Sequence, residues 1–152
     1  MTVQEQERDR GRAIMLEASR DIAFRRMVEG LVILPFAGRA ASDGEIDFKL
    51  YVEEDTDLPL PEIYERTRDA LAQEARALNL LAVTIVAAVS GADFDMGEGF
   101  DTAIQVHVEA PGFARVILAP YRIEDRDDGT SHLVTGELIA IEAEPEIFGR
   151  LQ

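Results

Sequence analysis

The residues of this chain that could do acid–base chemistry lie close together in one short stretch. His107 and Glu109 are two positions apart in an alternating segment, so in a β-strand both side chains would point to one face, with Gln105 beside them. A histidine can move a proton near neutral pH, and a neighbouring carboxylate can orient its ring. The H-x-E spacing also occurs in zinc deaminases, but those sites need two thiolates and the chain has no cysteine.

The partners of this pair depend on the turn at Pro111 and Gly112. A two-residue loop would place Arg115 opposite Val108, whereas a three-residue loop would place it opposite Glu109. We prefer the three-residue register because it pairs opposite charges across the strands and leaves one apolar face. It predicts a polar sheet face that is a candidate catalytic or small-molecule site, made of Gln105, His107, Glu109, Arg115 and Tyr121. A satisfied polar face or a dimer interface would use the same residues without catalysis, and we favour a non-enzymatic role.

Acidic residues and glycines crowd the segment GADFDMGEGFD, residues 91–101, which is a candidate cation-binding loop. An EF-hand loop needs ligands at positions 1, 3, 5 and 12, with glycine at position 6. Counted from Asp93, positions 5, 6 and 12 are Gly97, Glu98 and Ile104, so the template fails. A calcium site of another geometry would use Asp93, Asp95, Glu98 and Asp101. A solvated connection without metal is the simpler interpretation, and the sequence indicates no cofactor.

The overall charge restricts the partners that the chain can bind. Thirty acidic residues face fifteen basic ones, which gives a formal net charge of −15. Such a surface repels nucleic-acid backbones and anionic membranes, and it favours basic protein partners. No run of 18 apolar residues is present, and the first residues are polar and charged. We therefore expect a cytoplasmic protein without a membrane span.

The hydrophobic pattern indicates the elements that must position these groups. A helix is expected over residues 4–29, with residues 1–9 prone to fray, and a hairpin over strands 31–36 and 46–53. A second helix is expected to begin near Pro61 and to end at Asn79. Four further strands are expected at residues 80–90, 102–110, 113–123 and 132–143. The first of these is apolar throughout, which fits a central strand better than a buried helix.

These elements predict one α+β domain over residues 1–152. Its order is α-β-β-α-β-β-β-β, with a mainly antiparallel sheet of about six strands and two main helices. If both helices covered the same face of the sheet, the other face would need a partner, and a homodimer would result.

Chain direction gathers acidic segments at one end of this sheet. If strand 46–53 runs upward, the helix descends and strand 80–90 also runs upward, so both strands exit at the top. The turn after strand 113–123 lies there too. We expect an acidic rim that binds a protein, with a basic protein as one candidate, through Glu53, Glu54, Asp55, Asp57, Asp93, Asp95, Glu98, Asp125, Asp127 and Asp128. The alternatives are a divalent-cation site in the same loops and a rim that only keeps the protein soluble.

Overall fold

The computed structural model describes residues 15–25, 34–90 and 99–148 of the chain. Within them, two helices accompany a seven-stranded antiparallel sheet, which confirms the expected α+β class. The expected fraying of residues 1–9 and the first half of the expected strand 31–36, residues 31–33, fall outside the described residues.

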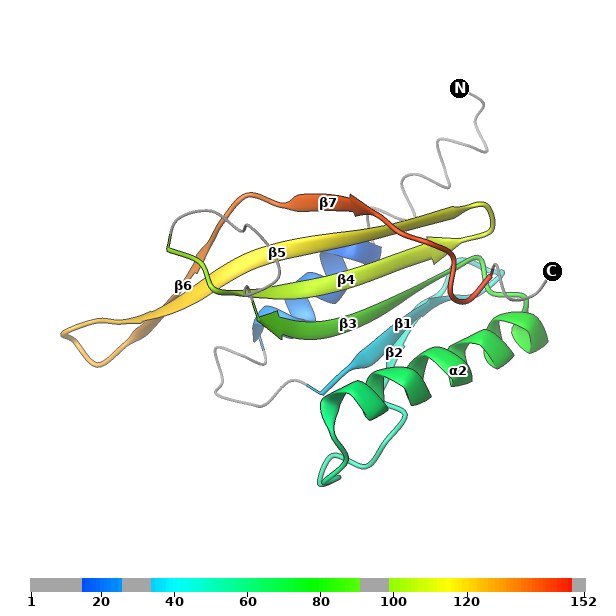
Figure 1. Cartoon of the computed structure of the whole chain (residues 1–152), viewed down its shortest axis with the longest axis horizontal. Coiled ribbons are helices and arrows are strands. Elements are labelled where there is room, and N and C mark those ends of the chain that lie inside the picture. The colour runs from blue at the N-terminus through cyan, green and yellow to red at the C-terminus, as the bar shows by residue number, and fades with distance from the viewer. Residues whose placement is uncertain (1–14, 26–33, 91–98, 149–152) are drawn as a thin grey trace.

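The elements follow the expected order along the chain. A helix covers residues 15–25 and is followed by a β-hairpin. The labelled elements are β1 (Phe36–Ala40), β2 (Ile46–Lys49), α2 (Leu60–Leu78), β3 (Ala82–Ser90), β4 (Thr102–Ala110), β5 (Phe113–Asp125), β6 (Ser131–Thr135) and β7 (Ile139–Glu142). The strands are arranged in the order β2-β1-β3-β4-β5-β6, and β7 also pairs with β5 (Figure 1). The apolar stretch 80–90 is thus a central strand, as predicted.

The first hairpin is shifted along the chain relative to the prediction. β1 occupies Phe36–Ala40, most of which the sequence had assigned to the connection between strands 31–36 and 46–53, and it lies between β2 and β3. Pro35 precedes the strand, so its missing N–H removes nothing from the ladder. The prediction was wrong because glycine and alanine read as turn residues. Here they are small residues that allow β1 to lie in a crowded position between two strands and beneath α2.

The expected last strand is divided into β6 and β7. Gly136 N donates to Pro120 O. Pro120 has no N–H, so it cannot donate the reciprocal hydrogen bond toward β6. Three residues, 136–138, therefore lie opposite two residues of β5, 119 and 120, in the manner of a β-bulge. The extra residue reverses the face of the sheet to which each following side chain of the strand points. Ile139 and Ile141 consequently face the same side of the sheet as their β5 neighbours Leu118 and Val116.

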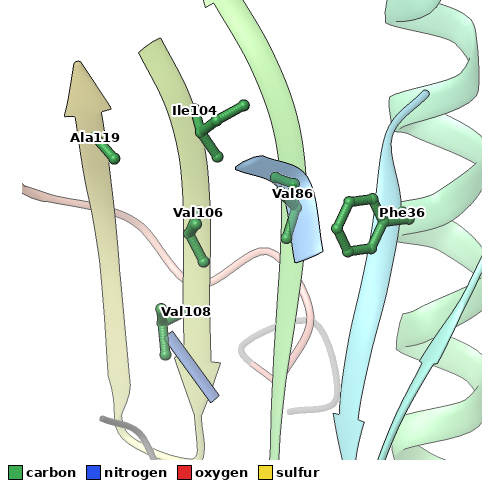
Figure 2. Close-up of a cluster of buried hydrophobic side chains, with 7 residues drawn as sticks. Phe36, Val86, Ile104, Val106, Val108 and Ala119 are labelled. Atoms are coloured by element: carbon green, nitrogen blue, oxygen red, sulfur yellow. The ribbon is translucent and has the colours of Figure 1, made fainter. Parts of the chain in front are cut away.

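The helix over residues 15–25 covers one face of the sheet. Met15, Ser19 and Ala23 recur every four residues, and all three are fully buried. Ser19 Oγ and Thr84 Oγ1 are 2.9 Å apart, which ties this helix to β3. The apolar cluster on this face is formed by Ala23, Phe36, Val86, Ile104, Val106, Val108 and Ala119, six of which are labelled in Figure 2.

The second helix covers the opposite face. α2 lies across β1, β2 and β3 on the side away from the first helix (Figure 1). Its buried residues Ile63, Thr67, Leu71 and Ala75 follow the helical repeat, and its last carbonyls are closed by Asn79 in the left-handed conformation. The homodimer was predicted on the condition that both helices cover the same face of the sheet. Because each face has its own helix, that condition is not met.

Candidate functional site

The polar residues predicted on one sheet face lie on two different faces. The turn at Pro111 and Gly112 is a two-residue loop, so Val108 pairs with Arg115 and His107 pairs with Val116. The preferred three-residue register was wrong. Gly112 adopts φ 76°, the left-handed conformation that lets a two-residue turn close tightly.

This register separates the two halves of the predicted catalytic set. Gln105, His107 and Glu109 face α2, whereas Arg115 and Tyr121 face the helix over residues 15–25. Arg115 lies over the ring of Phe113, and Tyr121 makes an edge-on contact with Phe24 at 6.0 Å between ring centroids. The five residues therefore do not form one site.

Glu109 is the centre of the polar group that the structure does assemble. Its carboxylate is fully buried and accepts four hydrogen bonds. Oε1 accepts from the backbone N–H groups of Ile147 and Phe148, at 2.9 and 2.7 Å. Oε2 accepts from the backbone N–H of Glu146 at 3.0 Å and from His107 Nε2 at 2.7 Å. An ionised carboxylate only accepts hydrogen bonds, so Nε2 carries the ring proton that is shared with Glu109.

These hydrogen bonds determine whether the buried carboxyl group of Glu109 is ionised. Burial alone would raise the pKa of Glu109, because it disfavours the charged form. The bonds from His107 and from the three backbone N–H groups outweigh burial and hold the pKa below its ordinary value of 4.5. Glu109 is therefore a buried carboxylate ion, stabilised by hydrogen-bond donors that converge from β4 and from residues 146–148.

Side chains of α2 and of residue 146 complete the surroundings of Glu109. Burial and the nearby charge of Glu146 raise the pKa of Tyr64 to about 12, against the opposing effects of Arg68 and Gln105. Glu146 Oε2 is a buried oxygen for which the described residues provide no hydrogen-bond donor. The cross-strand neighbours of Glu109 are Val83 and Ala114, whose modest size leaves room for the backbone of residues 146–148.

The His107–Glu109 pair therefore does not have the geometry of a catalytic pair facing a substrate. Only 2% of His107 and none of Glu109 is exposed, and the main chain of residues 146–148 occupies the positions from which a ligand would approach. A general base must lie within hydrogen-bond reach of a substrate proton. In this conformation the pair acts as an internal anchor for the backbone.

A second polar cluster, which the sequence did not reveal, joins the first hairpin to α2. Arg39 donates two bonds to the carboxylate of Asp47, at 2.8 and 2.6 Å, and a third to Glu74 Oε2 at 2.9 Å. Tyr51 OH also donates to Glu74 Oε2, and Lys49 Nζ lies 3.2 Å from Glu74 Oε1. The polar side of the alternating segment 46–53 was the only signal in the sequence. Covering by α2 converts part of that side into an ion-pair network.

Glu74 is the centre of this network, and its loss should be measurable. Burial would raise its pKa, but bonds from Tyr51, Arg39 and Lys49 lower the pKa below the ordinary 4.5. Glu74→Gln should reduce the free energy of unfolding at pH 7 by about 1–2 kcal/mol, because charge-assisted bonds are lost. Since the folded-state pKa is depressed, this stabilisation is complete above 4.5 and is lost as the pH falls through the folded value.

Urea unfolding at pH 7 and at pH 3.5 tests this expectation. The difference between the native protein and Glu74→Gln should shrink at the lower pH. Glu65→Gln, on the exposed side of α2, is the matched control and should change the stability by less than about 0.5 kcal/mol at both pH values. An equal loss for the two variants at pH 7 would contradict the assignment.

The acidic segments lie at one end of the sheet but at opposite edges. β2 and β3 both run antiparallel to β1, and β5 runs antiparallel to β4, so β2, β3 and β5 end on the same side. Residues 53–57 follow the edge strand β2, whereas residues 124–128 belong to the β5–β6 hairpin, which projects beyond the other strands (Figure 1). Four strand spacings of about 4.8 Å separate β2 from β5, about 19 Å across the sheet.

The structure describes only some of the acidic residues that were predicted at this end of the sheet. Asp93, Asp95 and Glu98 lie outside the described residues, while Asp101 is exposed immediately before β4. Glu53, Glu54, Asp55, Asp57, Glu124, Asp125, Asp127 and Asp128 are all exposed. Hydrogen bonds from the side chain and backbone N–H of Thr130 lower the pKa of Asp128. Glu124 pairs with Arg122 at 2.9 Å, and Ser131 donates to Asp125 at 2.8 Å.

Two further features are absent from the part of the chain that the structure describes. No three histidine, aspartate or glutamate side chains there converge as metal ligands. Neither of its helices combines the length and the apolar composition that crossing a bilayer requires.

Comparison of the chain with protein-family models, with curated proteins and with solved structures finds no match.

Proposed function

We propose that this chain is a non-catalytic cytoplasmic module that binds a basic protein through the acidic end of its sheet. The acidic end is defined here as two exposed segments, residues 53–57 and residues 124–128. The observation that carries the proposal is their placement, because strand direction brings both to one end although almost 70 residues separate them in sequence.

The separation of the two segments indicates the size of the partner. A single cation needs its ligands within a few ångströms, so segments that follow strands about 19 Å apart across the sheet cannot share one ion. A protein partner covers about 800 Å² at an ordinary interface, which is a far wider area than a metal ion or a small molecule contacts. This width favours a protein over a metal ion or a small molecule as the ligand of the acidic end.

The same separation predicts how the two segments contribute. At physiological ionic strength the screening length is about 8 Å, so charges on one segment are largely screened from those on the other. Their effects on binding should be close to additive. Their attraction should act chiefly on the association rate and should weaken as salt is added.

Neutralising variants test this proposal with a defined probe, a lysine-rich peptide of about 20 residues. One variant replaces Glu53, Glu54, Asp55 and Asp57 with the matching amides, and a second does the same at Glu124, Asp125, Asp127 and Asp128. A control variant neutralises four exposed acids at the opposite end: Asp43, Glu45, Glu142 and Glu144. All three variants change the net charge equally.

We expect each acidic-end variant to weaken peptide binding about tenfold in 50 mM salt, and the control variant less than twofold. Fluorescence anisotropy of the labelled peptide measures the affinity. Equal losses for all three variants would show that only net charge matters and would refute a specific acidic end. A protein that is captured from lysate by the native chain and not by the acidic-end variants would identify the partner.

A further inference from the structure

We propose that residues 143–148 form a strap that opens without unfolding of the sheet and that is held closed chiefly by the Glu109 carboxylate. The strap is defined by these residues, which follow β7 and have no helix or strand of their own. Its contacts with the remainder of the chain are concentrated at one carboxylate and two apolar side chains, and this concentration is what makes it separable.

The polar attachment of the strap is unusually localised. Three consecutive backbone N–H groups, those of Glu146, Ile147 and Phe148, donate to the two oxygens of one side chain. A β-strand would distribute these donors over several acceptors of a neighbouring strand. Here the loss of one negative charge affects all three bonds together, because each is charge-assisted.

The apolar attachment is a single fully buried residue. Ile147 belongs to the cluster under α2 with Ala37, Leu71, Ala75, Leu80, Val83 and Ile85, and Phe148 packs against it while half-buried. The free energy gained by burying one isoleucine and part of one phenylalanine is small. That is well below the stability of a typical domain, so the strap can open while the sheet persists.

The fit of the closed strap is also imperfect. Glu146 Oε2 is buried and has no hydrogen-bond donor among the described residues. The backbone N–H of the same residue donates to Glu109. Opening would bring Glu146 Oε2 into contact with water, which can donate hydrogen bonds to it. Opening would expose His107 and Glu109 to solvent together with the cluster that Ile147 covers.

Native-state hydrogen exchange at pH 7, followed residue by residue by NMR, tests the strap. In the native protein the amides of residues 146–148 should exchange at least tenfold faster than those of the β3–β4 ladder, with little dependence on added urea. Glu109→Gln should accelerate exchange of these three amides about tenfold and leave the β3–β4 ladder unchanged. Glu144→Gln, an exposed acid of the same strap, is the matched control and should change neither.

A second variant keeps the test decisive if Glu109→Gln does not fold. Ile147→Ala retains the carboxylate and should accelerate the same three amides selectively. Exchange of residues 146–148 at the rate of the β3–β4 ladder in the native protein would overturn the proposal, since the strap would then open only with the sheet. Equal acceleration of strap and ladder in both variants would overturn it as well.

Discussion

Replacing Ile85 with alanine is expected to lower the free energy of unfolding by about 2–5 kcal/mol. Ile85 is fully buried in β3, with Ala37 of β1 and His107 of β4 as its cross-strand neighbours. Its side chain lies in the cluster that α2 and Ile147 cover. Loss of three methyl or methylene groups leaves a cavity there, because strands on both sides hold the backbone in place.

Urea denaturation measures the loss, and two variants bracket it. Ile85→Val removes one methylene group and should cost about 0.5–1.5 kcal/mol. Leu81→Ala, just before the same strand and 52% exposed, should change the stability by less than about 0.5 kcal/mol. A cost for Ile85→Ala that resembles the Leu81→Ala value would contradict the position of the core beneath α2.

Replacing Gly38 with alanine is expected to cost about 1–3 kcal/mol, although alanine normally suits a strand at least as well as glycine does. An added Cβ would lie 2.5 Å from Thr84 Oγ1 and 2.8 Å from a ring carbon of Phe48. Neither neighbour retreats easily. The Thr84 hydroxyl is bound to Ser19, and the Phe48 ring packs edge-on against Phe36 at 6.2 Å between centroids.

A double-mutant cycle with Thr84→Ala tests the cause of this loss. Removing the hydroxyl relieves the shorter of the two contacts, so Gly38→Ala should cost less in the Thr84→Ala background than in the native one. The free energies come from urea denaturation of the four proteins. Strict additivity of the two losses would show that the Thr84 hydroxyl is not the obstacle.

The contrast between β1 and β3 shows how far sequence patterns reach. Residues 80–90 are apolar at almost every position, and only a strand or helix buried on both faces can accommodate such a run. β1 is buried too, but Gly38 and its alanine neighbours carry no such signal. Their small size has meaning only beside Thr84 and Phe48, which are distant in sequence, so the turn assignment was the natural error.

The sequence identified the polar residues of β4 and β5 but did not predict correctly which of them share a face of the sheet. Alternation alone placed His107 and Glu109 on one face, and the structure keeps them together at 2.7 Å. Whether Arg115 joined them depended on one residue in the turn, because a shift of one position moves every side chain of a strand to the other face. Cross-strand charge pairing favoured the longer loop. The left-handed conformation available to Gly112 permits the shorter one.

Sequence by itself determined the α+β class, the antiparallel hairpins, the second helix with its end at Asn79, and the common direction of β2, β3 and β5. These follow from local periodicity, from turn residues and from the path of an unbroken chain. Only the tertiary structure decided that the helices cover opposite faces, that Glu74 joins α2 to the first hairpin, and that Glu109 binds the strap. Those outcomes depend on contacts between residues 23 to 65 positions apart, whose energies arise from burial and geometry that no local pattern records.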